Sequence, residues 1–305
     1  MIAAESVCIW DAGAHLGEGA LWHPAKRAVY FVDIKGRRIH RCAPDGGARS
    51  SWEAPGQPGF VVPASDGSLV CALEDGLYRF DEASGAFAPL LKVEEDQPGN
   101  RFNDGHVDAG GNLWFGSMDD AQCAATGALY RLAAQGEPGS QGELTRVDDG
   151  YLITNGPAIS PDGRTLYHTD TPLRRVYAFD LRPDGSLAAK RLFLQLPEGS
   201  RPDGMAVDSA GDVWIALFGA GRIERYTAAG RLVGAVCFPC TNITKLAFGG
   251  ADLRTVYVTT AWKGLSPAQR AEQPLAGGLF AFRADTPGQP HHVFALGGDI
   301  GDCPP

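Results

Sequence analysis

The chain has 305 residues, of which 44% are hydrophobic and 21% charged, a composition typical of a globular protein with a substantial core. Its formal net charge is −9 and its Lys and Arg residues form no cluster, which argues against a nucleic-acid-binding surface. No stretch approaches 18 consecutive apolar residues, so the sequence predicts no transmembrane helix.

The N-terminal residues lack the apolar core of a secretion signal, because Glu5 and Asp11 interrupt it. Seven cysteines, an odd number in a long chain, fit a reducing compartment better than a disulfide framework. Cys237 and Cys240 have the spacing of a redox or zinc motif, but no second Cys or His pair accompanies them. We interpret them as buried or incidental thiols. We expect a cytoplasmic protein that is a monomer or a weak oligomer.

An internal repeat of about 40 to 50 residues organises the chain. Each repeat contains an apolar run, a turn rich in Asp, Gly and Pro, a strand with aromatic and β-branched residues, and a second strand. The turn-and-strand segments occur six times, at residues 24–32, 66–72, 110–116, 161–168, 210–216 and 252–258. Their downstream partners are residues 36–41, 76–80, 127–131, 175–179, 221–226 and 278–282. The alternation in these segments is typical of β-strands.

Six units of short antiparallel strands without intervening helices predict an all-β protein, a six-bladed β-propeller formed by residues 1–305 as a single domain. Residues 6–11 and 291–296 are both strand-like, and we expect them to pair within one blade and so close the ring. A short helical turn is expected only at residues 266–273. No shift in composition suggests a second domain.

The first apolar strand of four repeats begins with an oxygen-bearing side chain directly before glycine: Glu18, Asp104, Asn155 and Asp203. The other two repeats have Pro58-Gly59 and Thr244-Lys245 at the same place, and we call these six aligned pairs the column. In a propeller these strands start at the central channel, so the oxygens should converge on a hard or borderline divalent cation. Glycine would let backbone and ligand approach closely. Asp-Gly and Asn-Gly also mark turns, but these pairs precede an apolar run. We predict a central metal site at Glu18, Asn155 and Asp203.

Arg101 and Asn103 lie just upstream of Asp104, at the predicted mouth of the channel. From the residues alone, substrate binding and a surface salt bridge with an Asx turn are equally good interpretations. His15 has no histidine partner in the column and is interpreted as a loop residue. His168 lies on an alternating strand, and we interpret it as a core or loop histidine with satisfied ring nitrogens.

Several segments resemble the signature segments of the gluconolactonase, or senescence-marker-protein-30 (regucalcin), family. They are residues 16–22, Arg101-Phe102-Asn103-Asp104-Gly105, Thr154-Asn155-Gly156-Pro157 and Arg201-Pro202-Asp203-Gly204-Met205. The resemblance covers nearly the whole chain in order, and residues 31–35, 114–118 and 167–171 look closest to bacterial sugar-acid lactonases such as xylonolactonase. It implies a propeller that hydrolyses small-molecule sugar lactones, such as xylono-, arabinono-, glucono- or galactonolactone, with one divalent ion.

Transferred residue by residue, the resemblance implies that Glu18, Asn155 and Asp203 bind the metal and that Asp203 is also the acid/base. An all-oxygen ligand set suits Ca²⁺, Mg²⁺ or Mn²⁺ by hardness, and it is also compatible with Zn²⁺ or Fe²⁺.

Arg101 and Asn103 match substrate-contacting positions of the family. A further acidic contact follows shortly after the position of Met118 in better-known members, where this chain has both Asp119 and Asp120. Two alternatives remain: a phosphotriesterase-like or other-lactone hydrolase using the same metal, and a non-catalytic calcium-binding propeller.

Overall fold

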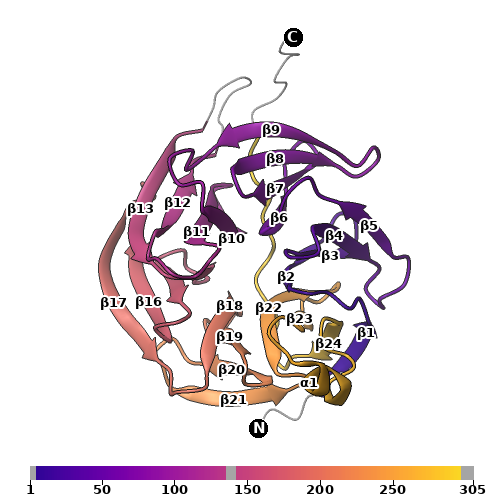
Figure 1. Ribbon diagram of the computed structural model, residues 1–305. Helices are drawn as coiled ribbons and strands as arrows, with labels where there is room; N and C mark the ends of the chain where they lie inside the picture. The colour runs from indigo at the N-terminus through magenta and orange to yellow at the C-terminus, as the bar shows by residue number, and fades with distance from the viewer. Residues whose placement is uncertain (1–4, 135–141, 297–305) are drawn as a thin grey trace.

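The structure is a computed structural model that describes residues 5–134 and 142–296. It is all-β apart from one short helix, and its antiparallel sheets surround a common centre in a propeller-like ring (Figure 1). Four of the sheets have four strands each, and one has eight. The all-β, propeller-like fold predicted from the sequence is therefore confirmed.

The four-stranded sheets each use consecutive strands of the chain. The first contains β2 (Gly17–His23), β3 (Ala28–Asp33), β4 (Arg38–Cys42) and β5 (Ser50–Glu53). The second contains β6 (Phe60–Pro63), β7 (Leu69–Leu73), β8 (Gly76–Asp81) and β9 (Ala86–Lys92). The third contains β10 (Asn100–Val107), β11 (Leu113–Asp119), β12 (Gly127–Leu132) and β13 (Leu144–Tyr151). The fourth contains β14 (Thr154–Ile159), β15 (Thr165–Asp170), β16 (Arg175–Leu181) and β17 (Leu187–Gln195).

The eight-stranded sheet joins two runs of strands. One run is β18 (Arg201–Val207), β19 (Val213–Phe218), β20 (Arg222–Tyr226) and β21 (Leu232–Cys237). The other is β22 (Asn242–Gly249), β23 (Thr255–Ala261), β24 (Leu279–Arg283) and the N-terminal β1 (Val7–Trp10). The two runs meet through the pairing of Phe218 with Asn242.

The two ends of the chain are fastened differently from the expectation. Strand β1 pairs antiparallel with β24, with Val7 opposite Ala281, so the N-terminal strand does complete a sheet begun by the C-terminal part of the chain. Residues 291–296 are not its partner. Phe294 instead forms a parallel bridge with Ala64, because this segment leaves β24 and crosses the ring toward β6.

All six predicted turn-and-strand segments contain a strand, from β3 to β23. The predicted helical turn is α1 (Pro267–Glu272), where the Ser266 side chain accepts a hydrogen bond from the Gln269 N–H and Gln269 reaches back to the Ser266 N–H. This reciprocal pair is a capping box, which satisfies the first free N–H groups of the helix. No helix in the described ranges has the length and apolar character needed to cross a membrane.

An aspartate stabilises the turn between the inner strand and the second strand in two places, after β10 and after β18. Asp108 accepts hydrogen bonds from the backbone N–H groups of Gly110 and Asn112 and, at 2.8 Å, from Trp114 Nε1. Asp208 repeats the pattern, accepting at 2.9 Å from Trp214 Nε1. Each aspartate thus joins the turn to a fully buried indole on the next strand, which fixes where the inner strand ends.

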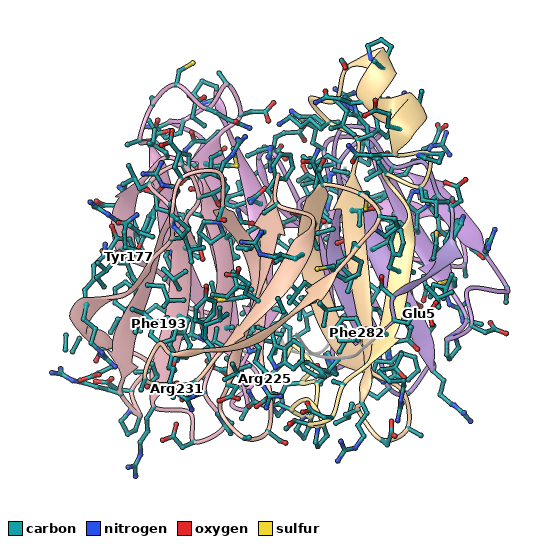
Figure 2. All side chains as sticks on the ribbon, turned by 90° about the horizontal axis from the view of Figure 1, so that it is seen from below. Glu5, Tyr177, Phe193, Arg225, Arg231 and Phe282 are labelled. Carbon is teal, nitrogen blue, oxygen red and sulfur yellow. The ribbon has the colours of Figure 1, made fainter. Side chains whose placement is uncertain are left out.

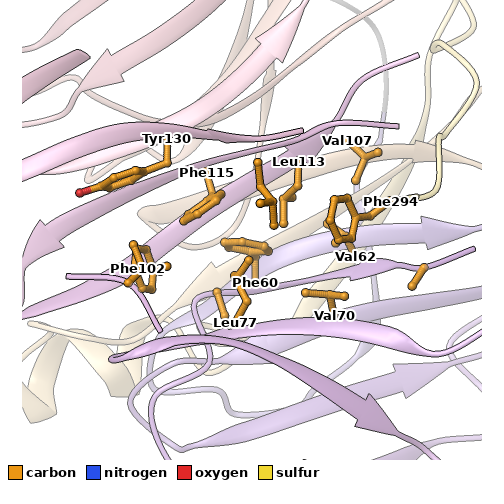
Figure 3. Close-up of a cluster of buried hydrophobic side chains, with 14 of the residues drawn as sticks. Phe60, Val62, Val70, Leu77, Phe102, Val107, Leu113, Phe115, Tyr130 and Phe294 are labelled. Atoms are coloured by element: carbon orange, nitrogen blue, oxygen red, sulfur yellow. The ribbon is translucent and has the colours of Figure 1, made fainter. Parts of the chain in front are cut away.

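The core lies between neighbouring sheets. Figure 3 shows one cluster, in which Phe60 of β6 packs beside Phe102 of β10 and Phe115 of β11, and Phe294 of the C-terminal segment lies at the opposite end of the cluster from Phe102. These side chains are at most 1% exposed. Fixed packing between sheets determines how the inner strands face one another.

The C-terminal segment, residues 285–296, holds several sheets together by hydrogen bonds. Gln289 Nε2 donates to the carbonyls of Ile159 and Val207, at 2.9 and 3.0 Å. The Phe294 N–H donates to Pro63 O, and the Ala295 N–H to Gly111 O. The segment therefore contacts the second, third and fourth sheets and the eight-stranded sheet, and it crosses the centre of the ring in Figure 1.

Candidate functional site

Five inner strands carry a break in their pairing register at the predicted column. The shifts fall at residues 18–21, 102–104, 155–158, 202–205 and 243–246. A β-bulge leaves residues unpaired and re-aims their side chains, and bulges are frequent next to functional sites. Here Asp203 and Lys245 lie within the unpaired residues, whereas Glu18, Asp104 and Asn155 are the paired residues at the edge of each break.

The three carboxylates of the column converge in a buried place. Glu18, Asp104 and Asp203 are 3%, 1% and 6% exposed. Burial and the charge of Asp104 raise the pKa of Glu18 to about 8. Burial, followed by the charges of Glu18 and Asp104, raises the pKa of Asp203. Carboxylates that disfavour one another's ionisation in this way would be stabilised by a bound cation.

Asn155 supplies an amide at the same place and is itself held by hydrogen bonds. Its Nδ2 donates to Thr171 Oγ1 at 2.8 Å, and its Oδ1 accepts from Asn103 Nδ2 at 3.0 Å. Thr171 in turn donates to the carbonyl of Pro202, next to Asp203, at 2.7 Å. This chain of bonds connects the fourth sheet to β18 and orients the amide.

The predicted ligands fit a divalent cation by their donor chemistry. In the described part of the chain, no group of three or more His, Cys, Asp or Glu side chains is arranged to hold a metal ion. The predicted set differs from such a group because only Glu18 and Asp203 are carboxylates, and the third donor is the amide oxygen of Asn155. Buried, mutually repelling oxygen donors of this kind suit a hard cation.

Arg101 and Asn103 form a network directly beside the column. Arg101 is 2% exposed, its Nη1 donates to Asn103 Oδ1 at 2.6 Å, and its Nε donates to Asp120 Oδ1 at 2.7 Å. Neither a surface salt bridge nor an Asx turn describes this arrangement, because the guanidinium is buried and Asn103 bonds to the neighbouring sheet through Thr154 O.

The structure separates Asp119 from Asp120. Asp120 accepts hydrogen bonds from Arg101, from Lys35 Nζ at 2.6 and 2.7 Å, and from Gln57 Nε2 at 3.2 Å. Burial opposes ionisation, but the bonds from Lys35 and Arg101 outweigh it and lower the pKa of Asp120. Asp119 instead accepts three backbone N–H groups of its own loop, residues 121–124. Asp120 faces the network and Asp119 shapes the loop.

Two histidines considered from the sequence lie apart from the column carboxylates. His15 stacks on Trp262 with ring centroids 4.0 Å apart, as a loop residue. His168 is fully buried, as expected, but neither ring nitrogen has a hydrogen-bond partner among the described residues. The expectation that its nitrogens are satisfied is wrong. The imidazole packs edge-on against the ring of Tyr151 and donates to and accepts from no described polar group.

Residues 16–262 match the family described as SMP-30/Gluconolactonase/LRE-like region. The chain belongs to this family. A 6-deoxy-6-sulfogluconolactonase of Pseudomonas putida is 33% identical, over 94% of this chain and 98% of its own length. An L-arabinolactonase of Azospirillum brasilense is 35% identical, over 91% of each chain. The solved structure of a calcium-binding protein, regucalcin, from Agrobacterium tumefaciens has a TM-score of 0.88 at 27% identity, covering 95% of this chain and 97% of its own.

Membership of the SMP-30/gluconolactonase family confirms the resemblance seen in the sequence motifs. Sequence reasoning missed Lys35, Gln57, Thr171 and Lys245, which complete the hydrogen-bond networks of the site. Lys35, Gln57 and Thr171 lie outside the six aligned pairs of the column, so the column gave no sign of them. Lys245 is itself a column residue, the one residue that replaces the column glycine.

Proposed function

We propose that the protein is a metal-dependent lactonase that opens aldonolactones of five or six carbons to sugar acids. The observation that carries the proposal is the convergence of Glu18, Asn155 and Asp203 beside the network of Arg101, Asn103 and Asp120. Family membership supports it, because curated relatives bear the names of sugar lactonases acting on different sugars.

Glu18, Asn155 and Asp203 would hold one divalent ion. When bound, such an ion supplies Lewis-acid activation of a carbonyl and makes a neighbouring water more acidic. Ca²⁺, Mn²⁺, Mg²⁺, Zn²⁺ and Fe²⁺ are all candidates, and the similarity to the calcium-binding regucalcin of Agrobacterium tumefaciens gives Ca²⁺ the first place in a screen.

Asp203 would act as the general base and acid. Its carboxylate takes a proton from the water that attacks the lactone carbonyl, and it returns a proton to the ring oxygen as the carbon–oxygen bond breaks. The raised pKa of Asp203, caused by burial and by Glu18, favours proton acceptance. The product is a sugar acid that leaves as its carboxylate.

Arg101, Asn103 and Asp120 would bind and orient the sugar. Arg101 can donate to hydroxyl or carbonyl oxygens, and the oxygens of Asp120 can accept from a sugar hydroxyl. Asn103 would exchange one of its bonds, to Thr154 O or Asn155 Oδ1, for a bond to the substrate. Asp119 was predicted as an alternative contact, and its hydrogen bonds to the loop favour Asp120 for this role.

We also propose that the ring has six blades within a single domain, residues 1–305. The eight-stranded sheet would count as two blades, since its halves meet only at the edge pairing of Phe218 and Asn242. A cytoplasmic location and a monomeric or weakly oligomeric state stay predictions from the sequence.

A pH-indicator assay with a panel of aldonolactones tests the function. We expect proton release above spontaneous hydrolysis, abolished by a chelator and restored by one of the five divalent ions. Asp203→Ala should remove this turnover while the protein stays folded. If Asp203→Ala keeps most of the chelator-sensitive turnover, the assignment of Asp203 is wrong.

A non-catalytic calcium-binding protein is the second candidate, favoured by the name of the regucalcin relative. Tight Ca²⁺ binding without hydrolysis of any five- or six-carbon aldonolactone would support it. Including a phosphotriester and a simple lactone in the same panel distinguishes the remaining alternative, a phosphotriesterase-like or other-lactone hydrolase.

A further inference from the structure

Lys245 is a buried cation inside the column. It lies on β22, at the bulge where the other inner strands carry glycine. Its Nζ donates to Asp104 Oδ2 at 2.6 Å, although β22 and β10 belong to different sheets. The side chains of the pair are 9% and 2% exposed, so water screens it little.

The path of the Lys245 side chain is fixed by a glycine of the neighbouring inner strand. A Cβ on Gly204 would lie 2.3 Å from Lys245 Cδ and 2.9 Å from Thr244 O, so no larger residue fits there. At this position of the column, glycine therefore makes room for a lysine stem of the protein itself. At its far end the Asp104 carboxylate is also held by the N–H groups of Gly105 and Gly156, at 2.8 and 3.0 Å.

The ion pair lies at one boundary of a central cavity. The cavity has a volume of about 590 Å³ and is lined by parts of all six inner strands, β2, β6, β10, β14, β18 and β22, and by residues 289–292. Asp104 and Lys245 line it, but the predicted ligands Glu18, Asn155 and Asp203 do not. Lys245 therefore borders the cavity and also contacts a carboxylate of the column.

Without a metal, the buried side chains around Lys245 carry more negative than positive charge. Glu18, Asp104 and Asp203 are acidic, and Lys245 is the cation in hydrogen-bond contact with one of them. Arg101 is also near, but it pairs with Asp120, which it shares with Lys35, and no hydrogen bond joins it to these three carboxylates in the described residues. Three carboxylates and one ammonium sum to two negative charges when all are ionised, which a divalent ion would neutralise. A buried excess charge is costly, so this sum matters for affinity.

We propose that Lys245 is a permanent counter-cation of the candidate metal centre and sets its preference for divalent over trivalent ions. This inference rests on the proposed function, because it takes the metal centre as given. Lys245 acts through charge and position and needs no contact with the substrate. Without it, the three carboxylates would match a trivalent ion instead.

Competition between Mn²⁺ and Tb³⁺ tests the proposal without an activity assay. The electron paramagnetic resonance signal of free Mn²⁺ reports Mn²⁺ binding, and its displacement by Tb³⁺ gives the ratio of the two affinities at the shared site. In Lys245→Met we expect the Tb³⁺-to-Mn²⁺ affinity ratio to rise by about tenfold or more, because Coulomb interactions over a few ångströms are strong in a buried site. The double variant Lys245→Met/Asp104→Asn should return it to within about threefold of wild type.

Two further variants keep the test decisive. Asp104→Asn alone leaves Lys245 in place and should lower the ratio by about tenfold, so it tests the same charge rule if Lys245→Met does not fold. Arg225→Met breaks a comparably buried ion pair with Asp208, and in Figure 2 Arg225 lies toward the end of the molecule opposite α1. It should cost stability and leave the ratio unchanged.

The inference is overturned if the Tb³⁺-to-Mn²⁺ affinity ratio of Lys245→Met stays within twofold of wild type. If only Asp104→Asn folds, the same limit applies to that variant. Either result would leave the proposed function intact. A wild-type protein that binds neither ion would overturn the proposed metal centre and this inference with it.

Discussion

The two adjacent aspartates offer the sharpest test of the candidate site. In Asp120→Asn, Arg101 and Lys35 lose the anion that both contact, at 2.7 and 2.6 Å. Breaking a fully buried ion pair costs about 3–5 kcal/mol, but the Asp120 side chain is 30% exposed, so about 1–2 kcal/mol is expected here. The variant should therefore fold and unfold at a somewhat lower urea concentration.

Activity should fall much further than stability in Asp120→Asn. A hydrogen bond from a sugar hydroxyl to a carboxylate contributes about 1.5–3 kcal/mol, equivalent to about 10- to 150-fold. Misplacement of Arg101 adds to this loss, so we expect kcat/KM for the best lactone to fall about 100-fold. Mn²⁺ affinity should stay within about threefold, because Asp120 is outside the predicted ligand set.

Asp119→Asn is the matched control, one residue away with the same chemical change. It weakens the hydrogen bonds to Cys123 and Ala124 and should lower kcat/KM by no more than about threefold. A larger loss of kcat/KM in Asp119→Asn than in Asp120→Asn would refute the assignment of the acidic contact.

Three further predictions concern buried groups. Thr171→Val removes the bonds to Asn155 and to Pro202 O, and it should weaken Mn²⁺ binding by about 10-fold, with little change of Tm; unchanged affinity would contradict a positioning role. Burial lowers the pKa of His168 to about 3, so the unfolded chain binds more protons than the native state below about pH 6.5 and stability falls as pH falls. From pH 7 to pH 5 this histidine should account for about 2 kcal/mol of lost unfolding free energy. Urea titrations of His168→Phe at the two pH values should lack that loss. Equal losses in the variant and the wild type would contradict this role of His168. Phe294→Ala should lower the free energy of urea unfolding by about 3–5 kcal/mol, because the Phe294 side chain is 1% exposed. The neighbouring Val293 is 44% exposed, so Val293→Ala should cost under about 0.5 kcal/mol. Similar costs for the two variants would disprove the packing role of residues 285–296.

Much of the fold could be predicted because it depends on local, repeated patterns. The alternation and the turn residues gave all six second strands, from β3 to β23, and Ser266 with Gln269 marked the beginning of α1. The partner of β1 could not be predicted this way. Strand pairing between distant segments depends on which edge is free in the assembled ring, and residues 291–296 and β24 were equally strand-like.

The candidate site was also only partly predictable from the repeated pattern. Glu18, Asn155 and Asp203 could be proposed as ligands because they occupy equivalent positions in three of the repeats. Lys35 and Thr171 lie just after the second strands β3 and β15, outside the column, and only the assembled sheets bring them to Asp120 and Asn155. The bulges at the column also left no signal in the sequence, because a bulge is defined by register with the neighbouring strand.

The pairing of β1 with β24 has a consequence for synthesis of the chain. Strand β1 is synthesised long before its partner β24, and residues 285–296 follow β24. Until then the edge of β1 is unpaired, and an exposed strand edge is a template for association with other chains. Contacts between distant segments also form slowly. The newly made chain is therefore most vulnerable to aggregation until β24 has been made, and termination before β24 would leave that vulnerability permanent.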